Sequence, residues 1–355
     1  MKTIELPLSA NYVDSWGTAQ AIRELLQNAI DSNAPLEFST LGNSIAITSR
    51  DVTLPLKTLI LGCSTKTNDD SQIGQFGEGY KLALLVLARE GLEVVVQNGK
   101  LDWTPSFRFS DTYGDTILHI DQEEQDRPDR DLTFKISGLD HSDMTDVFES
   151  CLQIQPLIED AIQTSRGRIL PSKAGKLYVN GLFVCDTGLD YGYDFLPQHI
   201  TLERDRQTVN SWELGNEVKE MWFETKRFDE IAEMMEKNVP DLANAEYGCP
   251  ESVKEACYRH FVSRNPGAVI TSTHAETQKA VAKGMTVVQS SGGFYYGVSQ
   301  SSSYKESSIA SFRKAETPEE WLQAWAHQNQ RGMSHPMRLS FKAVIKQAKN
   351  WKVSR

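Results

Sequence analysis

The sequence predicts a protein of the α+β class, in which helices pack against sheets with mainly antiparallel neighbours. Two Asn-Gly pairs, Asn98-Gly99 and Asn180-Gly181, each separate two apolar stretches and are strong signals for β-hairpins. Helical stretches are mixed with these hairpins instead of alternating with single strands, which argues against a doubly wound parallel sheet. The length of 355 residues allows two domains.

The composition indicates an ordinary water-soluble protein, with 39% apolar and 24% charged residues. The longest apolar run, from Leu82 to Ala88, is too short to span a bilayer, and Glu5 and Pro7 interrupt the position of a signal peptide. We therefore expect a cytoplasmic protein without membrane contact, and five scattered cysteines suit its reducing environment. A net charge of -11 argues against a surface that binds nucleic acid throughout.

The first predicted helix carries a line of polar side chains. Glu24, Asn28 and Asp31 share one face, because helical residues four and seven apart return to nearly the same angle. A helix packed on a core could present such a line to a cleft. On this stretch alone, the line is more typical of a solvent-exposed surface. Apolar residues occupy the opposite side of the helix: Ile22, Leu25, Leu26, Ala29 and Ile30.

A glycine-rich segment precedes the apolar helix expected over residues 82–89. Gly74, Gly77 and Gly79 would let backbone amides approach an anion closely, and a helix N-terminus carries partial positive charge. These residues predict a phosphate cradle, although three such glycines also occur in flexible helix starts. The polar residues 63–71 before them predict a loop.

The remaining elements of the N-terminal part follow from local signals. Asp14 or Ser15 can cap the first helix, which is expected to end near Asn33. The acidic run from Asp121 to Asp131 predicts a solvated loop. We expect strands over residues 36–40, 44–49, 92–97, 101–109, 116–120 and 132–137, and further helices over residues 53–62 and 144–157.

The C-terminal part is expected to be mainly helical. The last helix, residues 337–352, carries Lys342, Lys346 and Lys349 on one side, which suits nucleic acid, acidic lipid, an acidic partner or the acidic body of the same chain. Cys249, Cys257 and His260 lack the paired spacing of a zinc site. Other expectations are a hairpin over 176–184, helices over 211–237 and 250–260, a strand-helix-strand unit over 268–289, a loop or linker over 290–311, and a helix opening at 317–320.

Three elements stand in a suggestive order: the Glu24-x3-Asn28-x2-Asp31 helix, Asp51 after a strand, and the glycine segment from Ile73 to Tyr80. They resemble the ATP-binding module of gyrase B, Hsp90, histidine kinases and MutL, called the GHKL superfamily or Bergerat fold. The glycine segment is most similar to that of Hsp90. The resemblance implies an α/β sandwich with helices on one face of an antiparallel-rich mixed sheet.

Three regions are expected. The resemblance implies an ATP-binding domain over residues 1–160, followed by strands similar to a transducer over 161–210. Residues 211–355 resemble no known family, and their residue pattern predicts the mainly helical domain with its basic terminal helix.

The resemblance also implies ATP and Mg²⁺ as cofactors. Glu24 would activate the attacking water, Asn28 would ligate Mg²⁺, and Asp51 would accept a hydrogen bond from adenine. Arg204, with Arg206 as a rival, would reach the γ-phosphate, although glycines usual after the adenine-binding Asp are missing. The implied nucleotide-binding residues are Asn28, Asp31, Asp51, Lys66, Gly74, Gln75, Phe76, Gly77, Glu78, Gly79 and Thr133, with Ser64, Thr65 and Lys66 in a lid.

These roles favour an ATPase that couples nucleotide binding and hydrolysis to conformational change in a partner macromolecule, as in Hsp90 or MutL. A protein client, nucleic acid at the basic helix and a second copy of the chain are candidate partners. An alternative is a module that binds ATP without turnover and serves a sensing or structural role. A histidine kinase is disfavoured, because no phosphoacceptor helix precedes the first motif.

Overall fold

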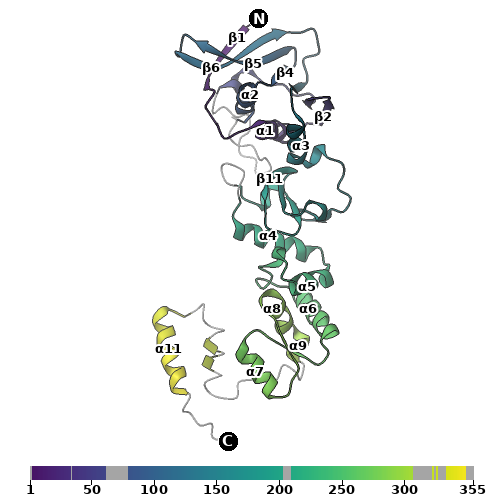
Figure 1. Cartoon of the computed structure of the whole chain (residues 1–355), viewed down its shortest axis with the longest axis vertical. Coiled ribbons are helices and arrows are strands. Elements are labelled where there is room, and N and C mark those ends of the chain that lie inside the picture. The colour runs from purple at the N-terminus through teal and green to yellow at the C-terminus, as the bar shows by residue number, and fades with distance from the viewer. Residues whose placement is uncertain are drawn as a thin grey trace. The chain divides into compact units, whose positions relative to one another are not determined.

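The computed structural model describes residues 2–32, 34–60, 79–202, 209–306, 322–323, 325–326 and 333–348 (Figure 1). The chain divides into two compact units, Met1–Thr225 and Lys226–Arg355. Each unit has its own packed elements. The boundaries expected near residues 160 and 210 stay a prediction.

The first unit contains a large antiparallel sheet, as the α+β class predicts. Its seven strands lie in the order β1-β6-β5-β4-β7-β3-β2, so strands distant in sequence are neighbours in space. The two edges are therefore formed by β1 and β2. The strands are β1 (Lys2–Ser9), β2 (Leu36–Leu41), β3 (Ser44–Ser49), β4 (Glu93–Asn98), β5 (Leu101–Ser110), β6 (Asp115–Glu124) and β7 (Leu132–Ser137).

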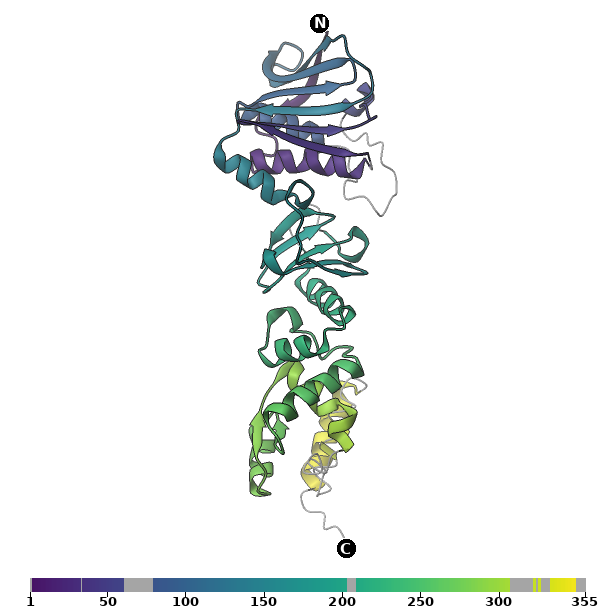
Figure 2. The ribbon, with the colours of Figure 1, turned by 90° about the vertical axis from the view of Figure 1, so that its right-hand side faces the viewer.

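Helices α1 (Thr18–Asp31) and α2 (Gly79–Arg89) pack together on one face of this sheet, and α3 (His141–Ser150) lies beside α1 (Figure 2). The apolar side of α1 and nearly all of α2 are buried in the core between the helices and the sheet. Burying such side chains is the main stabilising contribution, about 1.5–3 kcal/mol for each large apolar residue. This core fixes the direction in which the polar side of α1 points.

The strand register decides which side chains face the helices. Ile45 pairs with Ile136 and Ile47 with Phe134, and all four side chains are buried in the core. Because side chains alternate across a strand, the neighbouring positions point to the other face. The pair Thr48 and Thr133 therefore lies on the face away from α1 and α2.

A second sheet completes the first unit, with strand order β11-β10-β12-β9-β8. The strands of this sheet are β8 (Ile162–Thr164), β9 (Gly167–Leu170), β10 (Lys176–Val179), β11 (Leu182–Asp186) and β12 (Gly192–Phe195), and α4 (Ser211–Glu224) follows them. The buried carboxylate of Asp194 on β12 accepts hydrogen bonds from the Gly181 backbone N–H at 2.7 Å and from Arg168 Nε at 3.0 Å. These bonds link β12 to β9 and to the turn between β10 and β11. The hairpin expected around Asn180-Gly181 is confirmed.

The second unit is mainly helical, with a small parallel pair of strands. Helices α5, α6 and α8 pack against one another. Strand β13 pairs in parallel with β14, and α7 connects the two strands along the chain, as the expected strand-helix-strand unit requires. The elements are α5 (Phe228–Glu236), α6 (Glu251–Arg264), β13 (Val269–Thr271), α7 (His274–Ala282), β14 (Val287–Gln289), α8 (Gly292–Gln300), α9 (Ser302–Glu306) and α11 (His335–Ala348). Short 3-10 helices are η1 (Leu56–Leu59), η2 (Leu152–Ile154), η3 (Pro171–Lys173), η4 (Pro197–His199) and η5 (Pro240–Leu242).

Several expected boundaries are wrong. Gly17 is the N-cap of α1 and its N–H donates to Gln20 Oε1 at 3.0 Å, so neither Asp14 nor Ser15 caps this helix. The loop expected from Asp121 begins later, because β6 continues to Glu124 by pairing with β5 and β1. In place of the helix expected over 53–62, the structure has the short 3-10 helix η1. The helix expected over 144–157 is α3, which begins and ends earlier and is followed by η2.

The serine- and glycine-rich segment expected to be a loop over 290–311 instead forms α8 and α9 in its described part. Phe294, Val298 and Tyr304 are buried there, and their packing outweighs the low helix propensity of the surrounding residues. The helix expected at 317–320 lies outside the described residues.

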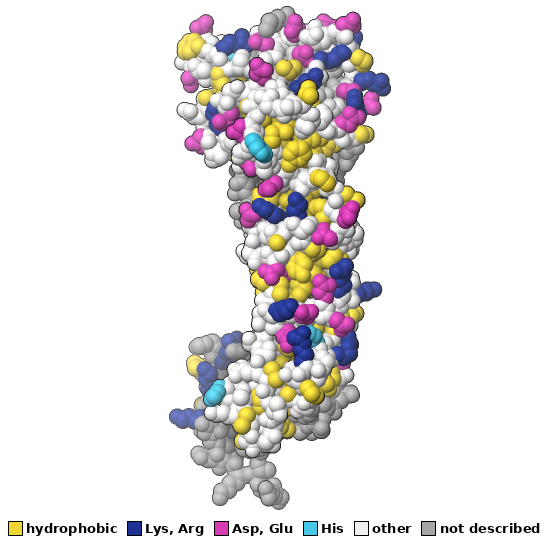
Figure 3. Space-filling view, turned by 45° about the vertical axis from the view of Figure 1, so that its right-hand side comes forward, with side chains coloured by type: hydrophobic (Ala, Val, Ile, Leu, Met, Phe, Trp, Pro, Cys, Tyr) yellow, Lys and Arg dark blue, Asp and Glu magenta, His cyan; other side chains and the backbone are white. Residues whose placement is uncertain are grey.

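The surface bears charges of both signs. On the face seen in Figure 3, basic side chains are interspersed with acidic ones on each unit. In the part of the chain that the structure describes, no helix is long and apolar enough to cross a bilayer.

Substitution of Gly167 is expected to destabilise the first unit. Gly167 has φ +139°, and a Cβ atom there would overlap the Asp194 carbonyl oxygen of the neighbouring strand. Gly167→Ala should lower the free energy of unfolding by about 2 kcal/mol or more, measured by urea denaturation. Gly188→Ala is the matched control, because a Cβ there meets open space. Equal stability of the two variants would contradict this assignment.

Candidate functional site

Helix α1 carries the first group of candidate residues. The Glu24 side of the helix is enclosed: Glu24 is 6% exposed and Asp31 is 4% exposed. Asn28 is half-buried, and its Nδ2 donates a hydrogen bond to the Glu24 carbonyl oxygen at 2.7 Å. Buried carboxylates require compensating polar contacts. The polar line of α1 is therefore not an ordinary solvated helix face.

Gly79, the first residue of α2, lies directly against this polar line. A Cβ atom at Gly79 would overlap Oε2 of Glu24 and lie 3.4 Å from Nδ2 of Asn28. Only a glycine allows the start of α2 to approach these two side chains so closely. The structure thus brings together Glu24, Asn28 and Gly79, which are separated by about fifty residues in the sequence.

The start of α2 is anchored by its next two residues. The Tyr80 hydroxyl donates to Thr58 Oγ1 at 2.9 Å, and burial raises the pKa of Tyr80 to about 12. Lys81 is fully buried, and its Nζ donates to the Ile60 carbonyl oxygen at 2.5 Å. Sequence reasoning missed these anchors, although a lysine within an apolar helix was a visible signal.

The structure places Asp51 at the surface. Its side chain is 73% exposed and forms an ion pair with Arg130 Nε at 3.2 Å, while its N–H donates to Asp131 Oδ1 at 3.0 Å. Arg50 also binds Asp131 at 2.7 Å, and hydrogen bonds from Asp51 and Arg50 lower the pKa of the Asp131 carboxyl. Asp51 therefore points into solvent, where a strand end meets the loop before β7.

Thr133 does not line the space between the helices and the sheet, contrary to its expected role beside adenine. Its Oγ1 lies 2.9 Å from Oγ1 of Thr48 on the opposite face of the sheet. Leu132, one residue earlier, is buried in the core beneath the helices. The physical reason is the period of two in a β-strand, which reverses the face at each residue.

The other candidate residues lie outside the described part of the chain. They are Ser64, Thr65, Lys66, Gly74, Gln75, Phe76, Gly77, Glu78, Arg204 and Arg206.

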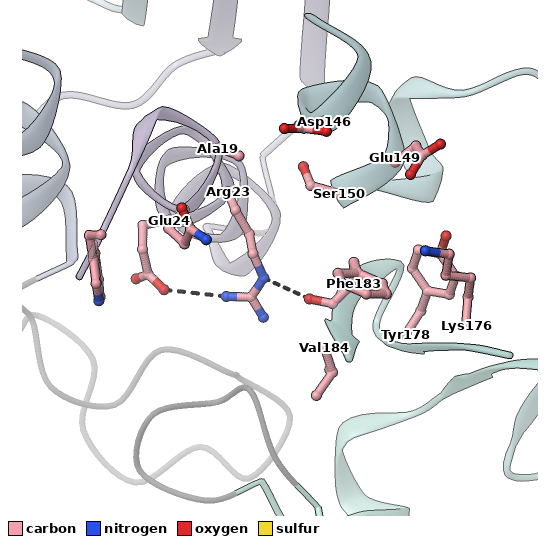
Figure 4. A pocket seen from close by; sticks show the side chains of 12 residues that line it. Ala19, Arg23, Glu24, Asp146, Glu149, Ser150, Lys176, Tyr178, Phe183 and Val184 are labelled. Atoms are coloured by element: carbon pink, nitrogen blue, oxygen red, sulfur yellow. Dashed lines mark hydrogen bonds and ion pairs between the residues drawn. The ribbon is translucent and has the colours of Figure 1, made fainter. Parts of the chain in front are cut away.

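A cavity of about 290 Å³ lies on the other side of Glu24, between α1, α3 and the β10–β11 hairpin (Figure 4). Arg23 projects into it and donates from Nε to the Phe183 carbonyl oxygen at 2.7 Å. The Nη1 atom of Arg23 lies 3.4 Å from Oε1 of Glu24. The Glu24 carboxylate is therefore held between the start of α2 and a guanidinium attached to the second sheet.

The donor set fits Mg²⁺ held partly by a phosphate ligand. Mg²⁺ takes oxygen ligands and usually binds through one or two protein groups plus substrate phosphates. The Asn28 carboxamide supplies such an oxygen beside the Glu24 carboxylate, and Nδ2 of Asn28 is already oriented by the helix. Within the described ranges, no cluster of three or more His, Cys, Asp or Glu side chains forms a complete metal site.

The zinc alternative is not supported by the second unit. His260 Nε2 lies 2.8 Å from Glu236 Oε2, and the Cys257 Sγ atom contacts Met235. Burial raises the pKa of the Cys257 thiol, which disfavours the thiolate that zinc requires.

Comparisons with known proteins give distant matches. No family model matches the sequence. An uncharacterized protein of Mycoplasma pneumoniae is 25% identical over 228 residues, which cover 59% of this chain and 92% of that protein.

Two solved structures of the ATPase region of Saccharomyces cerevisiae topoisomerase II, one of them bound to ICRF-187 (dexrazoxane), have a TM-score of 0.33 and sequence identities of 12% and 11%. Each match covers 47% of this chain and 62% of the topoisomerase chain, less than two thirds of its length. Similarities at this level do not assign the chain to a family.

The contact between Gly79 and Glu24 can be tested by a double-mutant cycle. In a Glu24→Ala background, Gly79→Ala should stabilise the protein by about 0.5–1 kcal/mol, because alanine favours a helix. With Glu24 present, the new methyl group overlaps the carboxylate, so this gain should disappear. Urea denaturation of the four proteins measures the coupling. Equal effects of Gly79→Ala in both backgrounds would show that the two residues do not touch.

Proposed function

We propose that the first unit is a Mg²⁺-dependent ATP-binding module of the GHKL type and that it hydrolyses ATP. The observation that carries this proposal is the packing of Glu24 and Asn28 against Gly79 at the start of α2. A carboxylate, a carboxamide oxygen and the backbone amides at a helix N-terminus form a suitable setting for a metal-bound phosphate chain.

The proposed mechanism assigns a distinct task to each residue. Asn28 would hold Mg²⁺, which supplies charge neutralisation at the phosphate oxygens when bound. Glu24 would orient the attacking water and accept its proton, and its low exposure protects this geometry from bulk solvent. Gly79 would leave room for this carboxylate while its helix directs amides at the phosphates. Asp31, Lys66 and the glycines before Gly79 complete the proposed binding set.

The adenine side of the proposed site needs a different arrangement from the one expected. Asp51 would have to exchange its ion pair with Arg130 for the adenine amino group. Its 73% exposure makes this exchange inexpensive, because exposed ion pairs contribute only about 0–1 kcal/mol. Leu132, rather than Thr133, is the β7 residue on the helix-facing side at this level.

Coupling of ATP turnover to a partner macromolecule is part of the same proposal. The second sheet is joined to α1 through Arg23, so that a change at Glu24 has a direct path to another layer of the same unit. Arg204 is proposed as the cation that reaches the γ-phosphate. A protein client, a second copy of the chain, and nucleic acid at the exposed Lys342 and Lys346 of α11 are proposed partners.

Binding without turnover is the second candidate function. Its support is that Oε1 of Glu24 already lies 3.4 Å from Nη1 of Arg23, a contact that a purely structural carboxylate would also make. Phosphate release by the wild-type protein distinguishes this function from hydrolysis.

Two substitutions separate nucleotide binding from catalysis. Glu24→Ala should reduce hydrolysis by about 10²-fold or more and change ATP affinity by less than about threefold, because a general base acts on the water. Asn28→Ala should instead weaken Mg·ATP binding by about tenfold or more, because a metal ligand is lost. Phosphate release and titration calorimetry measure the two effects.

Glu149→Ala provides the control for these substitutions, because Glu149 is an exposed carboxylate at the cavity on α3. It should leave both measurements unchanged. Wild-type turnover in Glu24→Ala would exclude Glu24 as the base, and unchanged affinity in Asn28→Ala would exclude its metal role.

A further inference from the structure

The connection between α1 and the second sheet rests on a local irregularity of β11. Leu177 pairs with Cys185, whereas the next residue, Tyr178, pairs with Phe183, so Val184 is an extra residue on the β11 side. Such a β-bulge redirects the backbone around it. β11 is an edge strand of this sheet, and on its outer side Leu182 forms an isolated bridge with Cys151. The next residue, Phe183, uses its carbonyl group to accept the hydrogen bond from Arg23.

Aromatic contacts hold the bulged strand in place. The Phe183 ring packs edge-on against Tyr178 with centroids 5.7 Å apart, and Lys176 Nζ lies 5.1 Å from the Phe183 ring centroid. Lys176 also forms an ion pair with Asp186 at 2.8 Å. These contacts within the second sheet hold the bulged strand, and the hydrogen bond from Arg23 on α1 adds to them.

Arginine is suited to join this carbonyl to Glu24. Its guanidinium is planar, and Nε and Nη1 donate in fixed and different directions. Here Nε meets the Phe183 carbonyl oxygen and Nη1 meets Oε1 of Glu24, as Figure 4 shows. If β11 moved and the guanidinium turned to keep its hydrogen bond with the Phe183 carbonyl oxygen, the Nη1 atom that faces Oε1 of Glu24 would move as well. Lysine has a single nitrogen and cannot reproduce both contacts with this rigidity.

We propose that Arg23 is a positioning residue, through which the place of β11 in the second sheet sets the orientation of the Glu24 carboxylate for ATP hydrolysis. This inference rests on the proposed function and deepens it. When the Phe183 carbonyl is in place, Arg23 holds Oε1 from one side while Gly79 borders Oε2 on the other. Displacement of β11 releases the guanidinium, and the carboxylate then loses this contact at Oε1. The second sheet thereby controls turnover without touching the nucleotide.

The experiment compares three variants of the full chain. Arg23→Gln removes the cation and its directed contacts with Phe183 and Glu24, and should lower kcat by about tenfold or more with ATP affinity within about threefold, because positioning affects the water-activating step. Arg23→Lys should recover less than about a third of the lost rate, because charge alone does not reproduce the two-point contact. Lys135→Gln, on the face of the first sheet that points away from α1, removes an exposed cation from β7 and should retain wild-type kcat.

Hydrogen exchange without nucleotide provides a readout independent of activity. Loss of the contact with Phe183 should speed exchange in peptides covering β11 in Arg23→Gln, and leave β2 unchanged because it lies at the far edge of the other sheet. Faster exchange together with a selective loss of kcat would support the inference. Unchanged exchange, wild-type kcat in Arg23→Gln, full recovery in Arg23→Lys, or an equal loss in Lys135→Gln would each overturn it.

The wild-type protein separates this inference from the function on which it rests. If the wild type fails to hydrolyse ATP, the proposed hydrolysis fails and the catalytic role of Arg23 fails with it. If the wild type hydrolyses ATP and Arg23→Gln does so equally fast, only the role of Arg23 is contradicted.

Discussion

The close approach of Gly79 to the Glu24 carboxylate is the constraint on which the candidate site depends. It requires α2 to begin where α1 presents its polar side, and both helices reach that position because their apolar residues share one core on the sheet. Tyr80 and Lys81 then fix the start of α2 to the segment near η1. The polar group of the site is thus positioned by apolar packing, which is dense and resists adjustment.

The two sides of Glu24 are built in different ways. Toward α2, the absence of a side chain at Gly79 creates the space for the carboxylate. Toward the second sheet, a long and charged side chain, Arg23, crosses to a backbone carbonyl. A close backbone approach on one side and a two-point polar contact on the other connect this one residue both to the first turn of α2 and to the neighbouring layer.

The residues proposed to bind the phosphates lie close together, whereas the residue proposed to bind adenine lies exposed at the surface. Glu24, Asn28 and Gly79 are in contact or nearly so, whereas Asp51 is exposed and paired with Arg130. The difference follows from their surroundings, since the first group lies between two packed helices and Asp51 follows a strand near the sheet edge. Electrostatic pairs at such an edge are weak and exchangeable, while packed helices are not.

The sequence by itself determined the α+β class, most strands, the helix bearing Glu24 and Asn28, and the hairpin at Asn180-Gly181, because periodicity and turn residues are local properties. Only the tertiary structure showed that Thr133 faces away from the helices, since the face of a strand depends on its register with distant neighbours. The same holds for the helix α8, which buried packing stabilises against its glycines, and for the contact of Arg23 with Phe183, which needs a bulge and a sheet edge to expose one carbonyl.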